Sequence, residues 1–117
     1  MRSVPFAPGL HLLLDLQGCC GLDDAERLET VLREAAAAAG AQVLGAAFHP
    51  FPGGGVTGVV LLAESHITLH TWPEARFAAV DIFMCGASDP RRAQAVIEAR
   101  LAPASVRLTV VPRGQVS

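Results

Sequence analysis

Apolar and polar residues alternate along several stretches of the chain, and this period of two residues predicts β-strands. The clearest case is residues 66–72, where polar side chains such as His66 and His70 alternate with apolar or small ones. Residues 56–63 are apolar at both alternating positions, which predicts a strand in the middle of a sheet. The expected strands are residues 10–16, 42–49, 56–63, 66–72, 77–84 and 106–111.

Two further stretches repeat their apolar residues at the spacing of a helix. In the first, over residues 24–39, Asp23 is the expected N-cap with Glu26 as its capping-box partner, and Gly40 is a typical residue just past the end. The second helix begins after Ser88 or Asp89 and ends before a proline at position 103.

The resulting order, β-α-β-β-β-β-α-β, predicts an α+β fold. We expect a two-layer sandwich in which an antiparallel sheet carries both helices on one face, as a single domain over residues 1–117. The other face would expose Trp72 and Phe83 among polar residues, an uncomfortable solvent surface. A second copy would cover it, so we expect a homodimer in which the two sheets pack together in αββα order.

Composition narrows the possible functions. The 117 residues are 51% hydrophobic with a net charge of −2, and no basic patch favours nucleic acid. No apolar run approaches the 20 or so residues of a membrane span, and Asp15 interrupts the leucine run that follows the N-terminus, so neither a membrane partner nor a signal peptide is expected. Two of the three cysteines, Cys19 and Cys20, are adjacent and form a poor disulfide framework, which favours the reducing cytoplasm.

The chain contains no lysine, because all nine of its basic residues are arginine. An enzyme built from this chain therefore cannot anchor pyridoxal phosphate through a lysine imine. Any electrophile for carbonyl chemistry has to come from another source.

Residues 63–74 gather most of the chemically versatile side chains of the sequence. They include a carboxylate, a hydroxyl, two imidazoles and an indole ring: Glu64, Ser65, His66, His70 and Trp72. No Gly-x-Ser-x-Gly elbow surrounds the serine, so a serine hydrolase fits poorly. A metal site built from His66, His70 and Cys85 has no recognised ligand spacing and is also disfavoured.

The motifs Glu64-Ser65-His66, His70-Thr71-Trp72-Pro73-Glu74 and Cys85-Gly86 resemble those of the prokaryotic S-adenosylmethionine decarboxylase proenzymes. The resemblance extends over nearly the whole chain, from residues 15–19 to the last strand. It implies that the precursor cleaves itself between Glu64 and Ser65, leaving a β chain of residues 1–64 and an α chain of residues 65–117. The serine would become a covalent pyruvoyl group, which needs neither pyridoxal phosphate nor a metal.

The residues are suited to this chemistry. The hydroxyl of Ser65 can attack the carbonyl carbon of Glu64 and convert the peptide bond to an ester. When a base removes the α-hydrogen of Ser65, the ester is eliminated, and the resulting dehydroalanine rearranges and hydrolyses to a pyruvoyl group. Such a ketone forms an imine with a substrate amine and accepts electrons as carbon dioxide leaves, in place of lysine-bound pyridoxal.

The resemblance also assigns roles to individual residues. His70 would remove the α-hydrogen of Ser65 during processing, and Cys85 would return a proton to the substrate carbanion after decarboxylation. Thr57 stands where the family usually has a serine that assists the acyl shift, so its extra methyl could slow cleavage. The substrate-binding residues would be Phe51 and Trp72, which sandwich adenine, and Glu74, which binds the ribose hydroxyls.

A length argument places these residues in shared sites. A hairpin that turns near Glu64 sets Thr57 opposite His70, and both lie about 16 Å along a strand from Ser65. We therefore expect Ser65 and Cys85 to come from one subunit and a second set to come from its partner: Phe51, Thr57, His70 and Glu74.

Two alternatives stay open at this level. A pyruvoyl enzyme of the same kind could act on ornithine or arginine, although Phe51, Trp72 and Glu74 favour the nucleoside substrate. An unprocessed homologue could instead bind a ligand or regulate a processed relative, which the threonine at position 57 weakly favours.

Overall fold

The computed structural model describes residues 9–114. This part of the chain forms six strands, two α-helices and one 3-10 turn. In chain order they are β1 (Gly9–Gln17), α1 (Ala25–Ala38), β2 (Val43–Pro50), β3 (Val56–Leu62), β4 (Ser65–Trp72), η1 (Pro73–Ala75), β5 (Phe77–Met84), α2 (Pro90–Leu101) and β6 (Ser105–Arg113). The prediction that no signal peptide is present falls largely on residues 1–8, which lie outside the described part.

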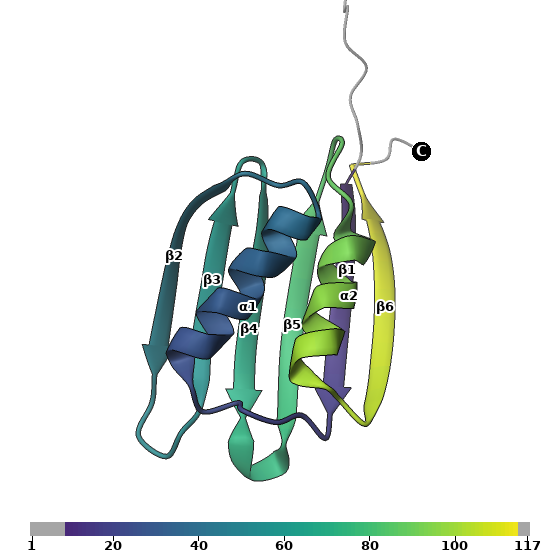
Figure 1. The fold of residues 1–117 in the computed structure, drawn as a ribbon. Helices are drawn as coiled ribbons and strands as arrows, with labels where there is room; N and C mark the ends of the chain where they lie inside the picture. Colours follow the sequence, from purple (N-terminus) through teal and green to yellow (C-terminus); the bar gives the residue numbers. More distant parts are fainter. Residues whose placement is uncertain (1–8, 115–117) are drawn as a thin grey trace, which may run out of the picture.

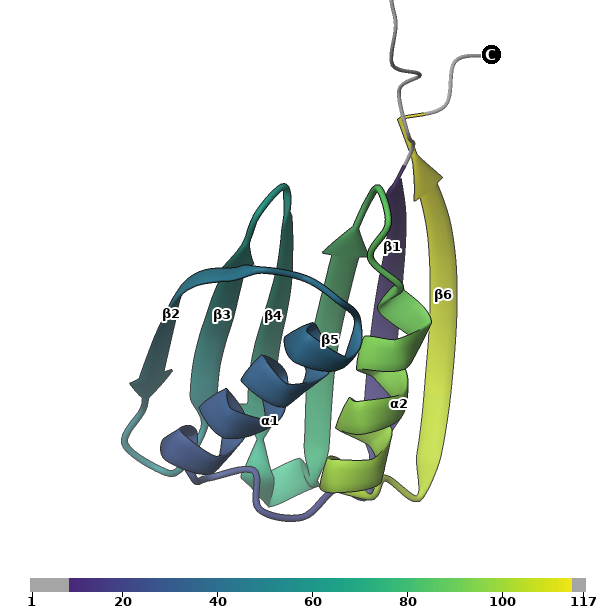
Figure 2. The same cartoon turned by 45° about the horizontal axis from the view of Figure 1, so that its top comes forward.

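The strands form one antiparallel sheet in the order β2-β3-β4-β5-β1-β6. Both helices lie on the same face of this sheet, side by side and roughly along the strands (Figures 1 and 2). The predicted α+β two-layer sandwich is therefore confirmed. Neither helix in the described region is long and apolar enough to cross a lipid bilayer.

The alternating pattern of the sequence decides which side chains face the helices. On β4, Ile67 and Leu69 are fully buried under the helices, while His70 and Trp72 on the opposite face are exposed. β5 alternates in the same way. β3 is an interior strand, as its apolar composition predicts, but only one of its faces lies under a helix, and Leu61 on the other is 54% exposed.

Short polar side chains set the helix ends. Asp24, and not Asp23, caps α1: its carboxylate accepts a hydrogen bond from the backbone N–H of Arg27, 3.1 Å away. The predicted cap is wrong by one residue, and the shift leaves Glu26 too early to complete a capping box. Asp89 caps α2 by accepting from the N–H of Arg91. Gly40 follows the end of α1 with φ 79°, a conformation that glycine adopts without strain.

The hydrophobic core lies between the helices and the covered face of the sheet. The fully buried side chains from the helices are Leu28, Val31, Leu32, Ile97 and Leu101. They pack on leucine, isoleucine and valine side chains from the four inner strands, and alanines 35, 36 and 93 let the helices approach closely. Most of the free energy of folding comes from this burial of apolar surface.

Gly58 on β3 makes room for an aromatic ring on its neighbour β2. A methyl group at this position would lie 2.2 Å from the ring of Phe48, which is packed against the core. We expect Gly58→Ala to destabilise the fold by about 1–3 kcal/mol, because the ring has to leave its position. Urea unfolding measures the loss. Gly45→Ala on β2 is the matched control, since a methyl there meets nothing within 4 Å, and an equal loss in both variants would contradict the steric argument.

Candidate active site

The predicted site residues lie in two groups at opposite ends of the β3–β4 hairpin. Glu64 and Ser65 occupy the turn that joins these strands, at the top of Figure 1, and Cys85 follows β5 at the same end. The second group, at the bottom of Figure 1, surrounds the start of β3 and the end of β4. It consists of Phe51, Thr57, His70, Trp72 and Glu74.

In the first group, the thiol of Cys85 contacts the peptide bond between Glu64 and Ser65. Glu64 has a left-handed backbone with φ 65°, which costs a residue other than glycine about 1–2 kcal/mol. Ser65 follows as the first residue of β4 and pairs with Leu62 across the turn. The thiol of Cys85 donates a hydrogen bond to the carbonyl oxygen of Glu64, with Sγ 3.3 Å away. This carbonyl belongs to the peptide bond that joins Glu64 to Ser65, so a proton donor and a hydroxyl flank the same bond.

The second group contains a hydroxyl–imidazole pair. Thr57 and His70 are direct partners in the register of β3 and β4, as the hairpin prediction requires. Their Oγ1 and Nδ1 atoms are 3.1 Å apart, within hydrogen-bond distance, and the tautomer of the imidazole decides which atom donates. Both side chains lie on the face of the sheet that no helix covers.

A cleft of about 440 Å³ adjoins this pair, large enough for a small organic ligand. Two exposed aromatic rings border it: Phe51 on the loop before β3 is 49% exposed, and Trp72 at the end of β4 is 43% exposed. His49 supports the first ring from 4.5 Å and Phe77 supports the second from 5.4 Å, measured between centroids. The carboxylate-bearing Glu74, on η1, is the one charged residue of the lining. The cleft can therefore stack a planar group and bind hydroxyls beside it.

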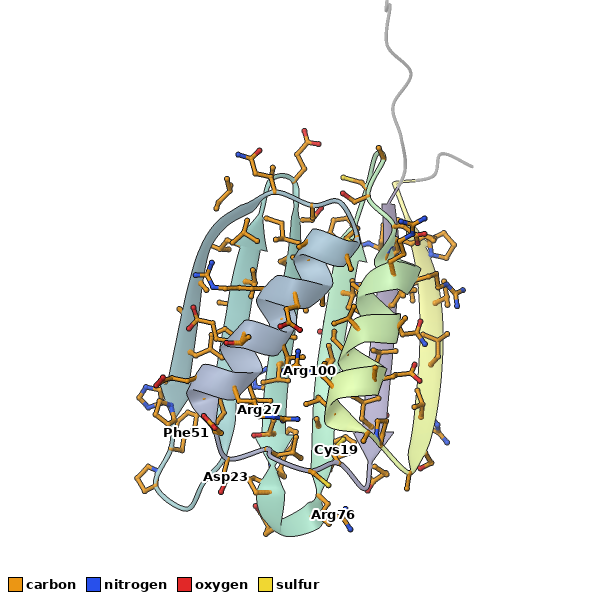
Figure 3. The ribbon with its side chains drawn as sticks, viewed as in Figure 1. Cys19, Asp23, Arg27, Phe51, Arg76 and Arg100 are labelled. Carbon is orange, nitrogen blue, oxygen red and sulfur yellow. The ribbon has the colours of Figure 1, made fainter. Side chains whose placement is uncertain are left out.

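Two arginines, Arg76 and Arg27, bind backbone carbonyls near the end of the hairpin that carries Thr57 and His70. Arg76, which follows η1 with φ 51°, donates hydrogen bonds to the carbonyls of Gly18 and Cys19. Arg27 on α1 donates to the carbonyl of Arg100 at 2.6 Å and so connects the two helices (Figure 3). Arg27 also donates to the carbonyls of Cys20 and Gly21, so the two arginines together hold the connection between β1 and α1 in place.

The adjacent cysteines of this connection differ in exposure. Burial, with a smaller contribution from Cys20, raises the pKa of the Cys19 thiol above its usual range, and Arg76 opposes the shift without cancelling it. A thiol with a raised pKa is a poor nucleophile at neutral pH. The structure thus supports a packing role for Cys19, whereas Cys20 is exposed.

The uncovered face of the sheet combines polar and apolar side chains. His11 on β1 lies 4.0 Å from the carboxylate of Asp81 and packs against the ring of Phe83, which the guanidinium of Arg113 also contacts. At the other side of this face Leu61 is exposed, and a cavity of about 470 Å³ shares Thr57 and His70 with the cleft. This face is the aromatic and polar surface that the sequence pattern predicts.

The structure separates some residues that the sequence alone allowed to meet. His66, His70 and Cys85 do not converge, because His70 pairs with Thr57 while Cys85 contacts the opposite end of the hairpin. Within residues 9–114 no three histidine, cysteine, aspartate or glutamate side chains gather as metal ligands would. Ser65 and His70 are five residues apart on one strand, about 16 Å, so a single chain does not bring them together.

Sequence reasoning missed two residues of this region, Thr71 and Arg76. Thr71 borders the cleft and is the one buried polar residue between residues 9 and 114. The only signal for it was a polar side chain at an apolar position of an alternating strand. Arg76 acts through its left-handed backbone and through carbonyls far away in the chain, so no local pattern indicates it.

Fold and site together define a class: small two-layer α+β proteins with a serine and a nearby thiol at one end of a central hairpin and an aromatic cleft at the other. The chain itself belongs to the S-adenosylmethionine decarboxylase family, because the model of that family, described as S-adenosylmethionine decarboxylase, matches residues 10–114.

Individual relatives agree with the family match. The chain is 44% identical over 111 residues to an S-adenosylmethionine decarboxylase proenzyme of Caldicellulosiruptor saccharolyticus, covering 92% of this chain and 90% of that protein. It is 51% identical over 82 residues to the proenzyme of the same description from Caldanaerobacter subterraneus subsp. tengcongensis. That match covers 68% of this chain and 66%, just under two thirds, of the relative.

A solved structure has the same fold. The crystal structure of the adenosylmethionine decarboxylase from Aquifex aeolicus VF5 superposes with a TM-score of 0.80 and 37% sequence identity. The superposition covers 95% of this chain and 94% of the other.

Proposed function

We propose that this protein is a self-processing decarboxylase that converts S-adenosylmethionine to decarboxylated S-adenosylmethionine, the aminopropyl donor for spermidine synthesis. One observation carries the proposal: Ser65 follows a left-handed Glu64 whose carbonyl contacts the thiol of Cys85. In a member of this family, that arrangement suits both cleavage before the serine and later proton donation at the same position.

The first step of the cleavage would use groups that already lie together. The hydroxyl of Ser65 attacks the carbonyl carbon of Glu64, and the peptide nitrogen leaves as an amine while an ester forms. The hydrogen bond from Cys85 to the carbonyl oxygen favours the attack, because it stabilises the negative charge that develops there. His70 of the partner subunit would then remove the α-hydrogen of Ser65, and the carboxylate of Glu64 would leave, which separates residues 1–64 from residues 65–117.

The dehydroalanine left at residue 65 would rearrange to an imine, take up water and release ammonia to become a pyruvoyl group. This group would serve as the electrophile, since the chain contains no lysine that could anchor pyridoxal phosphate. The pyruvoyl group supplies a ketone that accepts electrons from the substrate as carbon dioxide leaves. Cys85 supplies the proton that replaces the lost carboxylate on the substrate.

The cleft suits the adenosyl part of the substrate. Phe51 and Trp72 both border it and are exposed, and a purine held between their rings would gain stacking energy and bury apolar surface. Glu74 offers a carboxylate that accepts hydrogen bonds from ribose hydroxyls. An amino acid without a nucleoside, such as ornithine or arginine, would leave both rings unused.

A homodimer with shared sites reconciles the two ends of the hairpin. In a single chain, the face of the sheet without helices exposes Trp72 and Leu61, and the sheet of a second copy packed on this face would bury them. If two copies pack these faces with opposite strand directions, the upper end of one hairpin meets the lower end of the other. Each site then takes Ser65 and Cys85 from one subunit and the cleft residues from its partner: Phe51, Thr57, His70, Trp72 and Glu74.

Release of carbon dioxide from carboxyl-labelled substrates tests the proposed function. We expect the purified, cleaved protein to decarboxylate S-adenosylmethionine and to leave ornithine and arginine unchanged at the same concentration, because only the first occupies the aromatic cleft. Release from ornithine or arginine alone would assign the protein to a different substrate. An uncleaved chain without activity would favour a binding or regulatory role instead.

A further inference from the structure

Thr71 is an exception within the buried face of the sheet. Its neighbours on that face of β4, Ile67 and Leu69, are fully buried and apolar, whereas Thr71 brings a hydroxyl to a position that is only 5% exposed. A buried hydroxyl without partners costs about 1–3 kcal/mol, so its bonds indicate why a polar group is there.

The hydroxyl of Thr71 makes two hydrogen bonds that connect three segments. It accepts from the backbone N–H of Val56 at 2.9 Å and donates to the carbonyl of Leu22 at 2.8 Å. Val56 begins β3, just beyond the last strand pair of the hairpin, Thr57 with His70. Leu22 belongs to the connection between β1 and α1. One side chain therefore ties the start of β3 to β4 and to this connection.

Close backbone packing surrounds the same point. A methyl group on Gly55 would lie 3.0 Å from the carbonyl oxygen of Thr71, and one on Gly54 would contact Asp23 and Pro73. The loop of residues 51–55 thus lies between the β1–α1 connection and the segment that continues from β4 into η1. The loop carries one wall of the cleft, at Phe51, and the segment from β4 into η1 carries the other, at Trp72 and Glu74.

We propose that Thr71 is a positioning residue for substrate binding: its hydroxyl, through Val56 and Leu22, sets the separation between the Phe51 wall and the Trp72–Glu74 wall. This inference rests on the proposed function, because it assumes that the cleft holds the adenosyl group. Thr71 itself does not react, since both of its bonds are used within the protein. Its effect therefore falls on affinity for the substrate and not on the chemical step.

Steady-state kinetics on cleaved protein test this role. Thr71→Val keeps the shape and removes both hydrogen bonds, so we expect KM for S-adenosylmethionine to rise about tenfold while kcat per cleaved chain stays within about threefold. Thr71→Ser keeps the hydroxyl and should restore KM. Val31→Ala on α1 is the matched control: it removes fully buried methyl groups of a residue that does not line the cleft, so it should lower stability and leave KM unchanged.

A second variant covers the case in which Thr71→Val does not fold or is not cleaved. Gly55→Ala retains the hydroxyl and presses a methyl against the carbonyl of Thr71, which should also raise KM by displacing the loop. The inference is overturned if KM stays at the wild-type value in Thr71→Val, or if Thr71→Ser does not have a KM close to that of the wild type. Where Gly55→Ala has to replace Thr71→Val, an unchanged KM in Gly55→Ala overturns it. Wild-type protein that releases no carbon dioxide would contradict the proposed function first, and the role of Thr71 would fall with it.

Discussion

A chain in which alanine replaces Ser65 is expected to remain in one piece and to release no carbon dioxide from S-adenosylmethionine. The wild-type chain should instead appear as two fragments, residues 1–64 and residues 65–117, the second with a blocked N-terminus. The difference is all or none, because without the Ser65 hydroxyl nothing attacks the Glu64 carbonyl and no pyruvoyl group forms. A chain without lysine cannot anchor pyridoxal phosphate in its place. Intact-mass spectrometry of the purified proteins measures both outcomes.

Ser88→Ala is the matched control for this experiment. Ser88 precedes α2, close in sequence to Cys85, but Asp89 caps the helix, so removing the serine hydroxyl should leave cleavage intact. Fragments from the Ser65→Ala chain would contradict the assignment of the cleavage site. A wild-type chain that remains whole after long incubation would contradict self-processing as proposed.

Subunits that are individually inactive are expected to recover cleavage when they are paired. A heterodimer of Ser65→Ala and His70→Ala chains contains one complete site if sites are shared, because the intact Ser65 of one chain meets the intact His70 of the other. The His70→Ala chain should then be cut and its partner should stay whole. Co-expression with two different tags isolates the heterodimer, and the mass of each tagged chain gives the result.

The reciprocal pairing provides the control. A wild-type chain paired with a Ser65→Ala/His70→Ala double variant has no complete shared site, so the wild-type chain should remain uncut in that heterodimer. Sites confined to one chain predict the opposite in both experiments: no cleavage in the first heterodimer and normal cleavage of the wild-type chain in the second. The separation of about 16 Å along β4 favours the shared arrangement.

Local pattern was enough to predict the architecture. Alternation places all six strands within about two residues of their observed ends, and the helical spacing of Leu28 and Leu32 identifies the buried face of α1. The N-cap was misplaced because Asp23 and Asp24 are adjacent and either could cap a helix. Only the backbone conformation of Asp24 and its bond to Arg27 distinguish them.

The sequence indicates which residues belong to the candidate site, but it predicts fewer of the contacts between them. The hairpin length alone separates Ser65 from His70, and the observed register places Thr57 opposite His70. The contact between Cys85 and the Glu64 carbonyl depends on where β5 ends relative to the β3–β4 turn, which no spacing reveals. The role of Thr71 could not be predicted from the sequence, because its two hydrogen-bond partners, Val56 and Leu22, are 15 and 49 positions away.

The strand order has a consequence for the cleaved molecule. A cut between Glu64 and Ser65 would assign β1, β2 and β3 to one polypeptide and β4, β5 and β6 to the other. In the sheet, β1 lies between β5 and β6, so a strand of the first polypeptide is inserted into the second. The two pieces are interleaved and cannot separate without breaking three strand ladders. Cleavage should therefore follow folding, and the nicked product should unfold as one cooperative unit.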